Sequence, residues 1–159
     1  MLKDAAAFIM GFLANKVYED KKNLEKHKQM NNLIVRQEEA LKTYEKWVDT
    51  IHENKMISQY LLENDYKSVA IYGLGRLGKQ IYKEIFPTKV KVEYIIDQKY
   101  SLVNPFFEQT RCYNPEEEFP AADLIIVTVS GEAEAISAKL RTKVSCPVKT
   151  INELLFVLD

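Results

Sequence analysis

The segment SVAIYGLGRLGKQIYKEI, residues 68–85, constrains the fold more than any other part of this sequence. A short run rich in β-branched and aromatic residues, typical of a strand, leads into a GxGxxG motif at residues 73–78. A helical apolar pattern follows, and Pro87 predicts where that helix ends. The segment therefore predicts a strand, a tight glycine turn and a helix, which together form the opening unit of a parallel α/β sheet.

The rest of the second half alternates between strand and helix patterns. The predicted strands are residues 90–96, 110–113, 123–129 and 147–150. Residues 123–129 are apolar on both faces, as in a parallel strand covered by helices on both sides. This order predicts an α/β fold, namely a Rossmann-like parallel sheet of about five strands with helices on both faces.

Capping signals mark the helices between these strands. Asn114, Pro115 and Glu116 have the pattern of an N-cap, a proline at the first helical position and an acidic first turn. Another helix is predicted over residues 131–140. Thr150 and Glu153 have the spacing of a capping box that opens the last helix.

The first 65 residues differ in composition, with one glycine, no proline and many residues of high helix propensity. We expect an α-helical arm over 1–65 that serves in dimerisation or partner binding, followed by a Rossmann-like nucleotide-binding domain over 66–159. The arm has two apolar stripes, within 2–17 and 33–51, and a short helix is expected near 58–62. The polar stretch 19–32 is either a solvated helix or a flexible link.

Each glycine of the motif has a distinct expected task in a nucleotide-binding loop. Gly73 would allow the tight turn, Gly75 the close approach of a pyrophosphate, and Gly78 the packing of helix against strand. Asp97 follows the second predicted strand, nineteen residues after Gly78, where an acidic residue accepts hydrogen bonds from a ribose. The fingerprint predicts nucleotide binding, and its alternative is a Rossmann-like fold whose site is vestigial.

Residues 66–155 resemble the Rossmann NAD(P)-binding superfamily, and within it the small sugar-nucleotide-binding modules of bacterial polysaccharide biosynthesis. The resemblance rests on residues 68–85, the strand ending YIID and the segment ADLIIVTVS. It implies a pyrophosphate above the first turn of the helix and a second loop flanking the ligand. The implied ligand-binding residues are Gly73, Leu74, Gly75, Arg76, Leu77, Gly78, Asp97, Thr128 and Ser130.

Several implied contacts have a purely structural alternative. Arg76 would add a charge-assisted contact to a phosphate, or it is a solvated residue at the helix start. Ser130 would flank the ligand, or it caps the helix that follows. Because the carboxylate of Asp97 repels a 2′-phosphate, the expected ligand is NAD or a UDP-type sugar nucleotide rather than NADP.

The sequence shows no self-contained catalytic constellation. His27 and His52 lie in highly charged helical segments, where surface positions are expected. Cys112 and Cys146 have no histidine or second cysteine nearby and are expected to be inert, buried thiols. The catalytic residues therefore remain unknown, no metal site is predicted, and an enzymatic role is uncertain.

The overall charge and the apolar segments narrow the class of partner. With 22 basic and 23 acidic side chains, nothing draws the chain to nucleic acid. The apolar segment 5–14 is shorter than the ~20 residues that span a bilayer, so we expect no membrane span. The lack of a secretory leader and of a disulfide pattern predicts a cytoplasmic location.

Three functions are compatible with these observations. The first is a catalytically incomplete nucleotide-binding module that senses its ligand or presents it to a partner, such as a glycosyltransferase, in cell-surface polysaccharide synthesis. It would be dimeric through its N-terminal helices. The second is a scaffold or interaction protein with a vestigial site, in which the arm is the functional part. The third is an oxidoreductase or epimerase whose site is completed by a partner subunit.

Overall fold

The computed structural model describes residues 2–99 and 110–158, with side chains described from residue 13 onward. The chain divides into two compact units, residues 1–38 and residues 39–159. Among the described residues, no helix combines the length and the apolarity that a membrane crossing requires.

One helix, α1 (Leu2–His52), runs through the whole first unit and continues into the second. The polar stretch 19–32 lies within it and is helical, so the alternative of a flexible link is wrong. Leu13 and Val17 of the first predicted stripe are exposed. The side chains of Leu2, Ala6 and Ile9 from the same stripe lie outside the described set.

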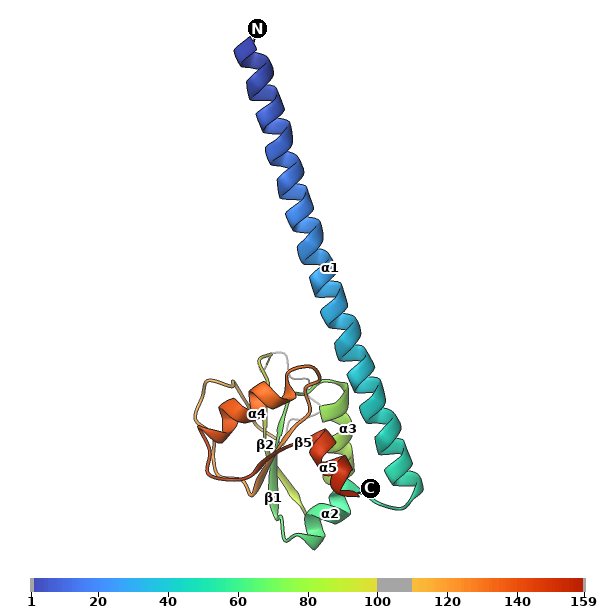
Figure 1. Ribbon diagram of the computed structural model, residues 1–159. Helices are drawn as coiled ribbons and strands as arrows, with labels where there is room; N and C mark the ends of the chain where they lie inside the picture. The colour runs from blue at the N-terminus through green and yellow to red at the C-terminus, as the bar shows by residue number, and fades with distance from the viewer. Residues whose placement is uncertain (1, 100–109, 159) are drawn as a thin grey trace. The chain divides into compact units, whose positions relative to one another are not determined.

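The second unit contains a five-stranded, entirely parallel sheet, which confirms the predicted fold class (Figure 1). The strands are β1 (Ser68–Tyr72), β2 (Lys91–Ile96), β3 (Cys112–Tyr113), β4 (Leu124–Val127) and β5 (Val148–Thr150). Their order in the sheet is β3-β2-β1-β4-β5. This is the order of a Rossmann-like doubly wound fold, in which β1 and β4 are central neighbours.

Helices cover both faces of the sheet, as the apolar pattern predicts (Figure 1). On one face, α3 (Arg76–Ile85) and α5 (Ile151–Leu158) pack in a core that includes Val69 and Ile71 of β1. On the other face, α4 (Ala133–Arg141) packs in a second core with Ala70 and Tyr72. Alternate residues of β1 therefore anchor the two cores.

The predicted capping box is confirmed at the start of α5. The backbone N–H of Thr150 donates to the carboxylate of Glu153, and the N–H of Glu153 donates to Thr150 Oγ1 at 3.1 Å. These reciprocal bonds satisfy two backbone donors and explain why the helix begins directly after β5.

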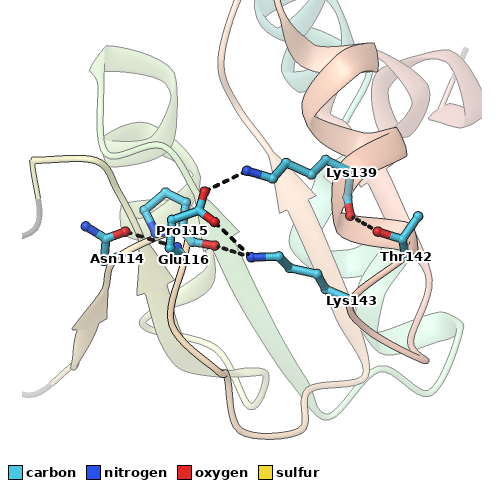
Figure 2. A network of polar contacts seen from close by, with 6 residues as sticks. All are labelled: Asn114, Pro115, Glu116, Lys139, Thr142 and Lys143. Atoms are coloured by element: carbon cyan, nitrogen blue, oxygen red, sulfur yellow. Dashed lines mark hydrogen bonds and ion pairs between the residues drawn. The ribbon is translucent and has the colours of Figure 1, made fainter.

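The helix predicted from Asn114 is wrong, because residues 114–117 form a turn. The N–H of Glu116 donates to Asn114 Oδ1 at 3.0 Å, which is the local capping geometry that the sequence suggested. Figure 2 shows the contacts that this turn makes: Glu116 accepts from Lys139 Nζ at 2.6 Å, and Lys143 Nζ donates to the carbonyl of Pro115 at 2.9 Å. These contacts join the turn to α4 and to the residues just after it, and the segment from β3 to β4 contains no helix.

The compact second unit begins at Glu39, so it includes the later part of the segment that the sequence assigns to the arm. Trp47 at the end of α1 is 5% exposed, and Ile57 and Leu61 of α2 (Ile57–Glu63) are fully buried in the same core as α3. The carboxylate of Glu84 joins these helices, accepting from Trp47 Nε1 at 2.9 Å and from the Ser58 N–H at 2.8 Å.

Candidate functional site

The candidate site lies at the carboxyl ends of β1 and β4. The chain leaves β1 through α3 toward β2, and it leaves β4 through α4 toward β5, so the two connections diverge to opposite sides of the sheet. This divergence defines the topological switch point, outside which ligands bind in open α/β sheets. The two loops that meet there are residues 73–75 and 128–132, and both were singled out from the sequence.

Gly73 makes the sharp turn out of β1. Its φ is +91°, a conformation that side chains disfavour, and its N–H donates to the carbonyl of Ile96 at 2.8 Å. A Cβ at this position would lie 2.6 Å from Val129 Cγ2. The expected task of Gly73 in the tight turn is therefore matched by its geometry, and Val129 closes the loop from the β4 side.

Gly78 lies where α3 crosses the end of β1. A Cβ there would overlap the carbonyl oxygen of Gly73 and would lie 2.9 Å from Thr128 Oγ1. Only a residue without a side chain lets α3 approach the strand this closely, so Gly78 has the packing task that the motif predicts.

Gly75 differs from the other two because a Cβ there would meet no described atom within 4 Å. Its backbone is extended, with φ −69°, and it is the N-cap of α3. Among the described residues, no side chain caps this helix start. The N–H groups of the first turn therefore have no N-cap side chain as partner, and together with the positive end of the helix dipole they suit an anion.

The carboxylate of Asp97 contacts the glycine loop itself. Asp97 Oδ2 accepts from the N–H of Leu74 at 2.7 Å, and Oδ1 accepts from the N–H of Lys99 at 2.7 Å. Asp97 directly follows β2, as expected from the sequence, and its bond to the loop backbone is a contact that the sequence did not predict. A carboxylate has about four acceptor positions, so these two bonds leave capacity for a ribose hydroxyl.

This contact predicts a structural effect of Asp97 that does not depend on any ligand. Asp97→Ala removes two charge-assisted hydrogen bonds and should lower the free energy of unfolding by about 1–3 kcal/mol. Asp97→Asn keeps one acceptor oxygen and should lose less. Urea unfolding of the ligand-free protein measures both, and equal stability of wild type and Asp97→Ala would show that the loop does not need this support.

Thr128 is buried and its hydroxyl is used within the protein. Thr128 Oγ1 lies 2.7 Å from the carbonyl of Gly73 and 3.0 Å from that of Tyr72, and it donates to these two oxygens. The Thr128 N–H also donates to the carbonyl of Tyr72 at 2.9 Å. Thr128 therefore ties the end of β4 to the end of β1, which is a positioning task that sequence spacing alone did not indicate.

The remaining predicted site residues divide between core and surface. Leu77 is buried in the core beneath α3, whereas Leu74 is half-buried and Arg76 is exposed at the helix start. Ser130 is half-buried and lies two residues before Glu132, the N-cap of α4. The alternative in which Ser130 caps that helix is therefore wrong.

Titratable groups near the site give little indication of catalysis. Cys112 and Cys146 are both only half-buried, so the expectation that they are buried thiols is wrong. Partial burial still raises the pKa of Cys112 to about 11 and also raises the pKa of Cys146, so both thiols stay protonated near neutral pH. Burial also raises the pKa of Tyr72, against the opposing charge of Lys139. Among the described residues, no three His, Cys, Asp or Glu side chains are grouped so as to hold a metal ion.

Tyr72 is the residue near this site that the sequence did not single out. It is the last residue of β1, directly before Gly73, and its ring is 8% exposed on the α4 face of the sheet. The signal in the sequence that could have identified it was its position at the end of a predicted strand.

Comparisons of the chain with protein-family models, with curated proteins and with solved structures found no match.

Proposed function

We propose that this protein is a nucleotide-binding module whose ligand is NAD or a UDP-type sugar nucleotide. The observation that carries the proposal is the exposed backbone at Gly75, where an uncapped helix start opens at the switch point of a doubly wound sheet. A pyrophosphate there would accept hydrogen bonds from the first N–H groups of α3. Arg76, exposed at the same helix start, would add a charged contact.

The position of Asp97 supports a preference for a free ribose hydroxyl. Its carboxylate is fixed beside the loop by the bonds to Leu74 and Lys99. A fixed negative charge repels a 2′-phosphate, so NADP should bind more weakly than NAD. Because residues 2–99 and 110–158 offer no recognisable catalytic group at this site, we propose that the module binds or presents its ligand and does not act as an enzyme by itself.

The setting that we propose is the cytoplasmic side of bacterial cell-surface polysaccharide biosynthesis. This part of the proposal rests on the resemblance of residues 66–155 to sugar-nucleotide-binding modules, and a glycosyltransferase is the class of partner that it implies. We also propose that the chain is a homodimer through its N-terminal helices, because α1 carries exposed apolar residues along much of its length.

Calorimetry and thermal shift with NAD, NADP and a UDP-sugar test the proposed ligand. We expect NAD or the UDP-sugar to bind, and a ligand at 100 times its Kd should stabilise the protein by ~2.7 kcal/mol. NADP at the same concentration should give a smaller shift. Failure of all three nucleotides to bind would contradict the proposal and favour the scaffold protein with a vestigial site.

A further inference from the structure

The end of α1 carries two apolar stripes, and only one of them is covered by the body of the protein. The covered stripe faces the core and consists of Ala40, Thr43, Trp47 and Thr50. The second stripe is rotated by about 100° around the helix and consists of Leu41, Tyr44, Val48 and Ile51. Its spacings of three, four and three residues are those of a helix that pairs with another helix.

The second stripe forms one wall of an apolar groove of about 390 Å³. Tyr44, Trp47, Val48 and Ile51 of α1 line it together with Met56, and Gln80, Lys83 and Glu84 of α3 form the opposite wall. The side chains of Leu41, Val48, Ile51 and Met56 are between 40% and 58% exposed. The carboxylate of Glu84 is already bonded to Trp47 and Ser58. The groove is therefore apolar along α1 and polar along its α3 edge.

Charges on the two sides of the stripe differ in sign. On the α3 side, Lys83 lines the groove. Arg76 lies near Tyr44: burial raises the pKa of Tyr44, and the positive charge of Arg76 acts in the opposite direction. On the other side of the stripe, helical geometry places Glu45 and Asp49, which are both exposed. The α3 wall also contains Glu84, whose carboxylate is bonded to Trp47 and Ser58 within the same copy. The cations Arg76 and Lys83 therefore form the basic part of this wall, here called the basic wall, opposite the acidic edge.

This arrangement is self-complementary in one orientation. When two copies place their stripes face to face with the α1 helices parallel, a two-fold axis along the helices brings the acidic edge of each copy to the basic wall of the other. In the antiparallel arrangement the two acidic edges would face each other and repel. Charge complementarity thus favours a second copy of this chain over an unrelated helix, and the parallel orientation over the antiparallel one.

We propose that the groove between α1 and α3 receives the α1 helix of a second copy of this chain in a parallel two-fold dimer. Val48 of one copy then packs against Val48 of the other, and Glu45 and Asp49 approach Arg76 and Lys83 across the interface. The inference is independent of nucleotide binding, and it assigns the self-association proposed above to a defined groove and orientation.

Analytical ultracentrifugation of the full chain tests the location of the interface. Val48→Glu should weaken the dimer at least about tenfold, because it puts a charge at the centre of an apolar contact. Val17→Glu is the matched control, since it makes the same change at a similarly exposed position of α1 outside the groove. A monomeric wild type, or a dimer that Val17→Glu dissociates and Val48→Glu does not, would overturn the proposal and leave the groove to another occupant.

Cross-linking and charge reversal test the orientation. Val48→Cys should form a disulfide-linked dimer on mild oxidation. Asp49→Cys should not, because in the parallel dimer this edge faces the α3 wall of the partner and the two copies of residue 49 lie apart. The wild type is the control for the two native cysteines. Glu45→Lys should weaken the dimer, and the combination Glu45→Lys with Lys83→Glu should restore it. Absence of the Val48→Cys cross-link in a dimeric protein, or failure of the combined reversal to restore association, would overturn the parallel arrangement. Circular dichroism shows whether each variant remains folded.

Discussion

Gly78→Ala should destabilise this protein by at least about 3 kcal/mol, a large part of the 5–15 kcal/mol that stabilises a typical domain. In most helices a glycine-to-alanine change stabilises by about 0.5–1 kcal/mol, so the expected sign is reversed here. The reason is steric, because the new methyl group would overlap the carbonyl oxygen of Gly73 and crowd Thr128 Oγ1. Neither group can move without shifting α3 away from β1.

Urea unfolding followed by circular dichroism measures this loss. Gly75→Ala is the matched control within the same motif, since its Cβ would meet no described atom within 4 Å and its backbone is extended. The control should unfold within about 0.5 kcal/mol of the wild type. If Gly78→Ala were as stable as Gly75→Ala, α3 would not approach β1 as closely as described.

Gly75→Leu should weaken nucleotide binding severely while leaving stability nearly unchanged. The leucine side chain has room to project into the open space at the start of α3, so the fold should tolerate it. That space is where a pyrophosphate would approach the N–H groups of the first turn, and a side chain there blocks the approach. We expect Kd for the bound nucleotide to rise at least about 100-fold, which corresponds to about 2.7 kcal/mol of binding free energy.

Calorimetry with the nucleotide that binds the wild type measures this effect. Lys79→Leu is a suitable control, because Lys79 is exposed on the same helix and lies beyond the first turn. This variant should bind nearly as the wild type does. Wild-type affinity in a folded Gly75→Leu variant would show that the nucleotide lies elsewhere on the protein, even if nucleotide binding itself is correct.

The parts of the fold that were predicted from the sequence are those set by short-range patterns. The strand from Ser68 and the helix from Arg76 follow from a β-branched run, a glycine turn and an apolar stripe, all within eighteen residues. The capping box of Thr150 and Glu153 was predicted for the same reason, since its two hydrogen bonds join residues three apart. Local geometry decides such features before any tertiary contact forms.

The features that were missed depend on residues far apart in the chain. The turn at Asn114 carries a correct local N-cap signal, but it forms a turn that is bonded to Lys139 of α4 and to Lys143 just after that helix. The bonds from Leu74 to Asp97 and from Thr128 to Gly73 span 23 and 55 residues. A pattern in the sequence can place such residues at the same edge of the sheet, but it cannot show which atoms become bonded.

The contacts of Glu84 determine how the protein can be shortened without harm. Since its carboxylate bonds Trp47 and the Ser58 backbone, and Ile57 lies in the same core, residues 47–58 belong to the folded body as much as the sheet does. Cutting the chain at residue 66 would expose the core side of α3 and leave the carboxylate without these partners. A shortened version that retains the body should therefore start before Glu39, where the compact unit begins.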